Sequence, residues 1–227
     1  MKWFFKRKAK LSSAIAQRLQ QLPTAAQDTG LNERLVVVDV EATGLNTRKD
    51  DILAIGAVAV EKGGMAFKDT FYCVLNREHT VNDAVLIHRL GPEALAQGVS
   101  VEEGLLAFLE FVGVAPLFAF HSPYDEQLLV RECKQHLHYR FANAFVDVAQ
   151  MAPLLTQASL VDATLDDWLN VFNLPMLQRH NALADAYATA KMLIMLLNKT
   201  HKAGITELSQ LKTALKRQAQ QAQPAMF

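Results

Sequence analysis

Two acidic residues interrupt an apolar run of the sequence, and few folds can accommodate them there. Residues 35–38 read Leu-Val-Val-Val and are followed at once by Asp39-Val-Glu41. A short β-branched run is typical of a buried central strand. Because side chains alternate faces along a strand, Asp39 and Glu41 project to the same side. Two neighbouring buried carboxylates are unfavourable unless a cation lies between them, so the pattern favours a divalent metal site.

Asp-x-Glu also occurs where a strand simply ends in solvent, and this alternative is weakened by the next residues. Thr43 and Gly44 follow directly. Glycine lets a ligand approach the backbone closely, and a threonine hydroxyl can bond to the turn or to a ligand oxygen. The whole four-position pattern therefore favours a functional site over a polar strand end.

Size and composition set the class of protein. The chain has 227 residues and a formal net charge of zero. This length suits one sizeable core and is short for two full domains. Without a global basic charge, binding to nucleic acid requires local basic patches. Cys73 and Cys133 lack a metal-type spacing, which argues against a disulfide framework or a zinc site and suits a reducing cytoplasm.

The chain is expected to divide into an extension at residues 1–33, a catalytic domain at 34–200 and a C-terminal helix and tail at 201–227. The first ten residues carry five basic side chains, but the residues after them are too polar for a secretory signal. This arm could touch a membrane surface or nucleic acid, or be a loosely docked end. No segment approaches the roughly 20 apolar residues of a transmembrane helix.

Hydrophobic periodicity predicts a mixed α/β sheet. Three strands in quick succession, the last two joined by the hairpin signal Lys62-Gly63-Gly64, indicate an antiparallel meander. Helices and strands then alternate, which indicates a sheet covered by helices on both faces. Strands are expected at 35–41, 52–61, 66–75, 117–121 and 145–148. Helices are expected at 9–22, 100–112 (with Ser100 and Glu103 in capping-box spacing), 125–136, from 164 through 172, 182–198 and 207–221.

Two more acids occupy positions that could reach the same site. Asp125 follows a short apolar strand and a turn, and Asp185 lies near the start of a long helix. Each also has a plain explanation, because carboxylates near helix N-termini are stabilised by the helix dipole. His180 precedes Asp185 by five residues, about 140° around a helix, so the two would not share a helix face. They can converge if His180 lies in the loop before the helix.

Taken in order, these residues resemble the three motifs of the DEDDh 3′–5′ exonucleases, the family that includes DnaQ-like proofreading enzymes. The likeness spans residues 34–198. It rests on Asp39-x-Glu41-x-Thr43-Gly44, on Tyr124-Asp125, and on His180 with Asp185-Ala186. Shorter similarities to the family occur at Ile87-His88, followed by Gly91 and Glu93, and at 164–167.

The resemblance implies a ribonuclease H-like fold and two bound divalent cations, Mg²⁺ or Mn²⁺. The implied metal ligands are Asp39, Glu41, Asp125 and Asp185, and the implied catalytic residues are His180, as general base, and Glu41. The implied substrate contacts are Thr43, Gly44, His88, His121 and Tyr124. Oxygen ligands suit hard cations, and two dications offset four carboxylates.

The second motif departs from the family pattern. Relatives usually carry Gly-His-Asn before two spacer residues and Phe-Asp. Here Phe120 and His121 stand at the usual His and Asn positions, and Tyr124 stands at the usual Phe position. Ala42 is a milder change. The metal ligand is kept, so retained activity is expected. The contact that the usual Asn supplies is changed, which could alter the substrate preference.

The leading hypothesis is a metal-dependent 3′–5′ exonuclease that trims DNA, either in proofreading or as a stand-alone enzyme. An RNA-trimming enzyme resembling ribonuclease T or oligoribonuclease is the first alternative, and a non-catalytic scaffold of the same fold is the second. The expected partner is nucleic acid with single-stranded or frayed 3′ ends. A bacterial sliding clamp or a polymerase subunit is a further candidate, since Gln223, Met226 and Phe227 resemble a clamp-binding tail. A frayed tail is the alternative.

Overall fold

Five strands form one mixed sheet in the order β3-β2-β1-β4-β5 in the computed structural model. The structure describes residues 11–24, 28–77, 90–156, 160, 162–175 and 179–222. The central strand β1 (Leu35–Ala42) pairs antiparallel with β2 (Ile52–Glu61), which pairs antiparallel with β3 (Gly64–Val74). On its other side β1 pairs in parallel with β4 (Leu117–Ala119), and β4 with β5 (Phe145–Asp147). The predicted meander and mixed sheet are confirmed.

The predicted hairpin connects β2 and β3. Lys62 and Gly63 have φ angles of 52° and 70°. Two consecutive residues with positive φ form the hairpin turn whose twist matches that of the flanking strands. The short β2–β3 connection therefore fixes the register of the meander.

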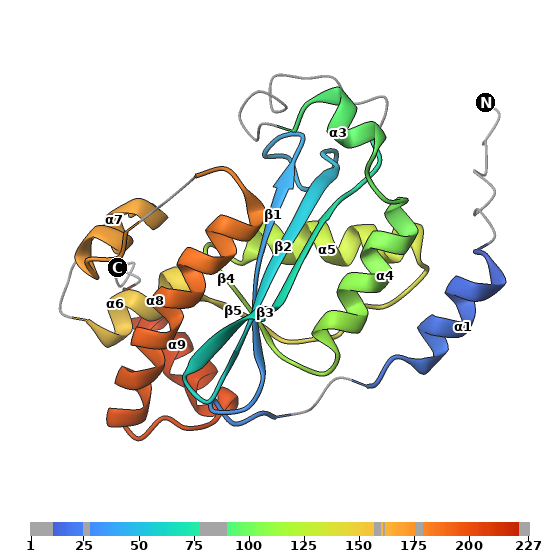
Figure 1. Ribbon diagram of the computed structural model, residues 1–227. Coiled ribbons are helices and arrows are strands. Elements are labelled where there is room, and N and C mark those ends of the chain that lie inside the picture. The colour runs from blue at the N-terminus through green and yellow to red at the C-terminus, as the bar shows by residue number, and fades with distance from the viewer. Residues whose placement is uncertain are drawn as a thin grey trace, which may run out of the picture.

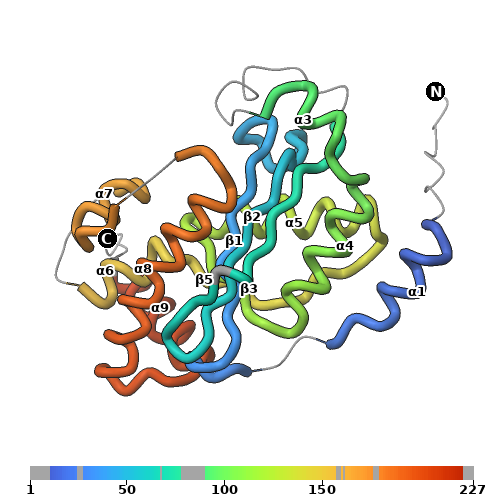
Figure 2. The backbone as a smooth tube through the Cα atoms, in the orientation of Figure 1, coloured from blue at the N-terminus to red at the C-terminus, as the bar shows by residue number. Residues whose placement is uncertain are grey.

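Helices cover both faces of the sheet (Figures 1 and 2). Leu35 and Val37 point to one face, whose core includes residues of α8 (Ala182–Lys202), and Val36 and Val38 point to the other, whose core includes residues of α4 (Val101–Val112) and α5 (Pro123–His136). This alternation gives each face of β1 its own hydrophobic core. On the α8 side lie also α6 (Val148–Leu155), α7 (Leu165–Val171) and α9 (Leu208–Ala222).

Among the residues that the structure describes, two helices were not expected from the sequence. The first is α6, which begins at the residue after β5, and Asp147 is both the last strand residue and the N-cap whose side chain accepts from Ala149 N at 2.9 Å. Without a loop between strand and helix, no turn signal marks the boundary. The second is α3 (Pro92–Ala96), a helix of a little over one turn.

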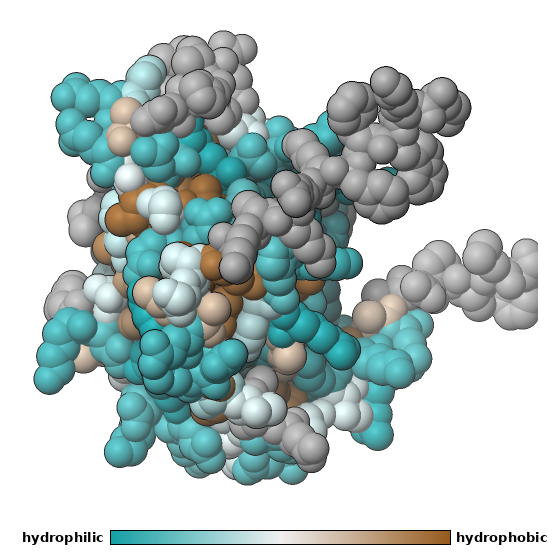
Figure 3. All heavy atoms as spheres, turned by 90° about the vertical axis from the view of Figure 1, so that its right-hand side faces the viewer, coloured by the Kyte–Doolittle hydropathy of each residue, from teal (hydrophilic) through white to brown (hydrophobic). Residues whose placement is uncertain are grey.

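The N-terminal helix α1 (Ser13–Gln21) packs against α4 through Ile15 and Leu19, and its Arg18 pairs with Glu103 and, at 2.7 Å, with Glu110. This side of the molecule is mainly hydrophilic, with small apolar spots (Figure 3). Farther along, the chain at 28–31 bonds to the start of α9, with Leu208 N donating to Thr29 O at 3.0 Å. The proposed division at residues 33 and 200 stays a prediction.

Three sequence predictions fall outside the described residues: the basic arm at 1–10, His88, and the tail with Gln223, Met226 and Phe227. Within the described part of the chain, none of the helices has the length and apolarity needed to cross a membrane. Cys73 and Cys133 are both free thiols.

Candidate active site

The first two acids lie on the central strand, facing the long helix α8. Asp39 and Glu41 share the face of Leu35 and Val37, and Asp39 lies opposite Gly56 of β2. A Cβ atom at Gly56 would stand 2.2 Å from the carbonyl carbon of Ala182, the first residue of α8. Only glycine there lets the start of α8 lie directly on the sheet, next to Asp39.

The third acid, Asp185, projects from the first turn of α8. Asn181 caps this helix, and its side chain accepts from Ala184 N at 3.0 Å. One Asp185 oxygen accepts from His180 N at 3.1 Å, so the loop before the helix holds the carboxylate. One oxygen from each of Asp39, Glu41 and Asp185 lies within 4.8 Å of the other two. Three converging, largely buried carboxylates form an oxygen donor set that suits a hard divalent cation.

The fourth acid, Asp125, lies beside this group rather than within it. Its Oδ1 accepts from Val40 N at 3.1 Å, between the two acids of β1. Strand β4 pairs with β1 only at Val36 and Val37. The backbone of β1 after Val37 is therefore unpaired on this side, and Asp125 at the start of α5 can bind there. Three of the four predicted metal ligands therefore converge, and the fourth, Asp125, lies close enough for its charge to act on Asp39.

Burial raises the pKa of three of these acids, Asp39, Asp125 and Asp185. The pKa of Asp39 is raised well above its ordinary value, first by burial and then by the charges of Asp125, Glu41 and Asp185. Burial raises the pKa of Asp125 to about 8, against the hydrogen bond from Val40 N. Burial also raises the pKa of Asp185, although Arg179 opposes that shift. The ionised carboxylates of the cluster thus repel one another, and a bound dication would offset this repulsion.

His180 and Arg179 stand together before α8. His180 is exposed and has a left-handed backbone, with φ of 62°. The predicted position of His180, in the loop with Asp185 on the first turn, agrees with the structure. Arg179 was not predicted: its Nη1 lies 3.0 Å from Asp185 Oδ1 and its Nε 3.3 Å from Asp166 Oδ1. A cation next to the third acid lowers the charge repulsion in the cluster.

The loop after β1, residues 43–51, is organised around Asp50. Its carboxylate accepts from the Thr43 hydroxyl at 3.0 Å and from Asn46 N at 2.7 Å. A Cβ at Gly44 would stand 2.7 Å from this carboxylate, so glycine is needed for the close approach. Tyr124 also binds this loop, because its hydroxyl donates to Gly44 O at 2.6 Å. The roles of Thr43, Gly44 and Tyr124 toward substrate stay predictions.

The turn of the altered second motif contains a residue with a left-handed backbone. His121 has φ of 57°, a conformation that Asn and His tolerate better than most residues. His121 N donates to Asp147 Oδ1 at 3.0 Å, and the Phe120 and His121 rings meet edge to face at 4.5 Å. Asp147 is a further residue that sequence reasoning missed, because it gains its role only when β5 lies next to β4.

Comparison with known sequences places most of the chain in one family. A model of the exonuclease family RNase_T matches residues 36–193. The PolC-type DNA polymerase III of Caldanaerobacter subterraneus is 28% identical over 85% of this chain, and that of Bacillus subtilis 30% identical over 76%. The matched segments are 14% and 12% of those polymerases, so the chain corresponds to a small part of each.

Solved structures agree on the fold. Escherichia coli Exonuclease I in complex with a dA16 oligonucleotide matches with a TM-score of 0.64 at 14% identity, over 75% of this chain and 42% of that one. Cell-death related nuclease 4 matches with a TM-score of 0.63 at 11% identity, over 73% and 64%. The predicted ribonuclease H-like architecture is confirmed.

Proposed function

Because the chain belongs to the RNase_T exonuclease family, we propose that it is a metal-dependent 3′–5′ exonuclease that removes 5′-mononucleotides from the 3′ end of DNA. The observation that carries this proposal is the convergence of Asp39, Glu41 and Asp185 within 4.8 Å, with Asp125 beside them. These residues come from a strand and two helices, and largely buried carboxylates brought this close together are unfavourable unless a cation neutralises them.

The carboxylates fit two divalent cations such as Mg²⁺ or Mn²⁺. Asp39, Glu41 and Asp185 would hold one ion, and Asp39 with Asp125 would hold the second. When bound, the two ions lower the pKa of water and neutralise charge on the scissile phosphate. Burial of the ligands keeps competing water away, which strengthens each charge interaction in the site.

His180 is the proposed general base. Its exposed position beside Asp185 lets it take a proton from the attacking water. The water oxygen bonds to phosphorus, and the bond from phosphorus to the O3′ of the preceding nucleotide breaks. The products are a 5′-mononucleotide and a strand shortened by one residue with a free 3′ hydroxyl. Arg179, held by Asp166 and Asp185, supplies fixed positive charge near the reacting phosphate.

DNA is the proposed substrate because the similar solved and curated proteins point to it. The Exonuclease I match carries a DNA oligonucleotide, and the sequence matches are DNA polymerases. The single-stranded or frayed 3′ end is the proposed partner. Association with a polymerase or a sliding clamp stays a prediction from the tail residues.

The test uses single strands of equal length and sequence, one DNA and one RNA, each labelled either at the 5′ or at the 3′ end. With Mg²⁺, the 5′-labelled DNA should shorten stepwise and the 3′-labelled DNA should release labelled mononucleotide first. Excess chelator should abolish both. Asp39→Ala should lower kcat by at least about a hundredfold, because it removes the ligand shared by both proposed ions.

The outcomes separate the candidates. Turnover of RNA alone would replace the DNA proposal by RNA trimming. Wild type and Asp39→Ala that are equally inactive would favour a scaffold, and equal activity would indicate a contaminant. Asp69→Ala serves as the matched control, since Asp69 is a partly exposed strand carboxylate that pairs with Arg34, away from the cluster.

A further inference from the structure

Helix α5 binds the loop 43–51 along one row of side chains. Tyr124, Gln127 and Arg131 are spaced by three and four residues, so they lie on one helix face. The Tyr124 hydroxyl donates to Gly44 O at 2.6 Å, and Gln127 Oε1 accepts from the Thr47 hydroxyl at 2.8 Å. The loop is thus held from its first residues to its middle by a helix that also carries Asp125.

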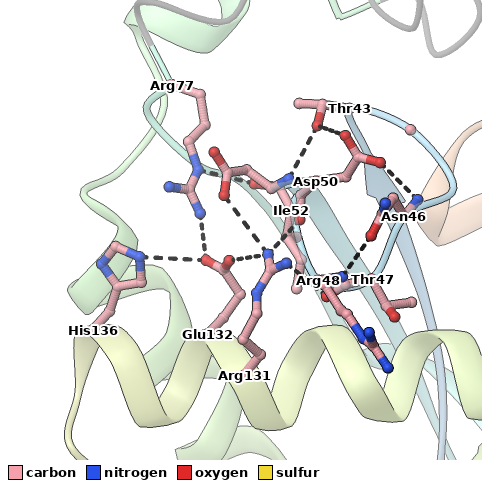
Figure 4. Close-up of polar contacts among 12 residues, drawn as sticks. Thr43, Asn46, Thr47, Arg48, Asp50, Ile52, Arg77, Arg131, Glu132 and His136 are labelled. Atoms are coloured by element: carbon pink, nitrogen blue, oxygen red, sulfur yellow. Dashed lines mark hydrogen bonds and ion pairs between the residues drawn. The ribbon is translucent and has the colours of Figure 1, made fainter.

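Arg131, the third residue of this row, binds two carbonyl groups of the loop. Its Nη1 donates to Thr47 O at 2.6 Å, and its Nη2 donates to Asp50 O (Figure 4). A guanidinium can serve two carbonyls at once because its donors form a rigid fork. The same Nη2 lies 3.7 Å from Asp51 Oδ1, so Arg131 reaches the end of the loop as well.

A buried ion cluster fixes Arg131 in turn. Glu132 has no exposed side-chain area and accepts from Arg131 at 2.7 Å and from Arg77 (Figure 4). Arg77 also donates to the carbonyl of Ile52, the first residue of β2, at 3.2 Å. His136 lies 3.6 Å from Glu132. A fully buried carboxylate is tolerated only with such partners, so the cluster has one well-defined arrangement.

The held loop borders an open hollow of about 740 Å³, lined by Leu45, Asn46, Thr47, Arg48, Asp50 and Gln127. Leu45 is 91% exposed, and Arg48 is exposed as well. An apolar side chain and a guanidinium that face solvent on the loop directly after β1 can contact the base and the phosphate of a nucleic-acid strand. Such contacts require a loop that is already ordered before the strand binds.

We propose that Arg131, fixed by Glu132 and Arg77, is a positioning residue that holds the loop 43–51 for binding of the nucleic-acid strand. This rests on the proposed exonuclease function. The hydroxyl of Tyr124, which the usual phenylalanine of this motif lacks, adds a second tie to the same loop. The contacts of Tyr124, Gln127 and Arg131 with the loop raise the affinity for the strand. The acids and His180 carry out the chemistry.

The experiment compares Arg131→Gln with the matched control Arg34→Gln. Arg34 also makes two bonds to a carboxylate, Asp69, and one to a carbonyl, Phe111 O, but at the opposite end of β1. Two substrates are used: a single-stranded DNA oligonucleotide, and the nitrophenyl ester of thymidine 5′-monophosphate, which has no neighbouring strand. Amide hydrogen exchange of residues 44–51 and the melting temperature are measured for each variant.

Arg131→Gln should raise the KM for the oligonucleotide about tenfold, with kcat and the rate on the ester changed by less than about twofold. Amides 46–50 should exchange faster in this variant and not in Arg34→Gln. Arg131→Lys should restore part of the affinity, because lysine can serve one carbonyl but not both. Tyr124→Phe should give a smaller rise in KM in the same direction.

Unchanged exchange in the loop would overturn the proposal, and so would faster exchange with an unchanged KM. An equal loss on oligonucleotide and ester would assign Arg131 to the chemistry or to general stability instead. If the wild type cleaves neither substrate, the proposed function fails, and the exchange data together with the affinity for the oligonucleotide still decide whether Arg131 orders a binding loop.

Discussion

Asp125 combines a structural and an ionisable role in one side chain. Its carboxyl accepts from Val40 N on the open side of β1 and is almost fully buried, and burial raises its pKa to about 8. Asp39 and Asp185, whose pKa values are raised as well, surround the same point. In the absence of a cation, the folded protein therefore keeps protons that the unfolded chain releases.

This arrangement predicts how stability depends on pH. The folded pKa of Asp125 lies above its ordinary value of 3.8, so between about pH 4 and pH 8 the folded state binds more protons than the unfolded state. The free energy of unfolding should therefore be highest at the acidic end of this window, fall as pH rises, and level off above pH 8. Thermal melting in chelator at several pH values measures this trend.

Excess Mg²⁺ should reduce the fall of the unfolding free energy with rising pH, because cation binding stabilises the ionised carboxylates and adds binding free energy to the folded state. Asp125→Asn should also weaken the pH dependence of the unfolding free energy, since asparagine can still accept from Val40 N but does not titrate. If wild type and Asp125→Asn lose stability in parallel over this window, the buried carboxyl is not the group responsible.

At the scale of elements, the contact between α8 and β2 assembles the site. Gly56→Ala would place a methyl group against the backbone of α8, at 2.2 Å from the carbonyl carbon of Ala182. Backbone atoms cannot rotate away, so α8 must shift, and Asp185 shifts with it. We expect a loss of about 3 kcal/mol or more in the free energy of unfolding, together with a large loss of exonuclease rate.

Gly64→Ala is the control for this substitution. Its Cβ would meet only Glu61 O, at 3.9 Å, an ordinary contact. Its unfolding free energy should change by less than about 1 kcal/mol, with activity kept. Denaturant unfolding and the rate on single-stranded DNA compare the two variants. Equal stability of Gly56→Ala and Gly64→Ala would contradict the close packing of α8 on the sheet.

Most elements could be predicted because their signals are local. A β-branched apolar run marks β1, the two glycines of Lys62-Gly63-Gly64 mark the β2–β3 turn, and apolar residues at helical spacing mark α4 and α8. The helix α6 could not be predicted in this way, since Asp147 ends the strand and caps the helix at once. Pro153 inside α6 also reads as a helix breaker in isolation.

The acids of the candidate site could be proposed from motif spacing, whereas most of the residues that contact and position the surrounding segments could not. The bond of Asp147 to His121 N and the bonds of Arg131 to the loop 43–51 join residues 26 to 84 positions apart, which a single sequence does not reveal. Gly56 did carry a signal, because a glycine within a strand often marks close backbone approach. The ion pair of Arg179 depends on how the loop before α8 returns to the sheet.

At the scale of the whole molecule, the acids lie where β1 and the starts of α5 and α8 meet, while α1 lies on the outer side of α4 (Figure 1). The described part of α1 contributes no residue to the acidic cluster. Its ion pairs through Arg18 are exposed to solvent and screened by salt, so they add little to stability. The apolar contacts of Ile15 and Leu19 with the α4 side form the remaining attachment.

A chain that begins at Asp28 should therefore keep the candidate site. It retains the pairing of residues 28–31 with the start of α9, which holds the N-terminal end of the domain. We expect its melting temperature to fall by only a few degrees and its kcat and KM on single-stranded DNA to change by less than about twofold. Arg18→Gln in the full chain is the control for the ion pairs alone. A rise in KM that grows as salt is lowered would instead show that the removed basic arm binds the strand, and a loss of kcat would show that α1 supports the site through α4.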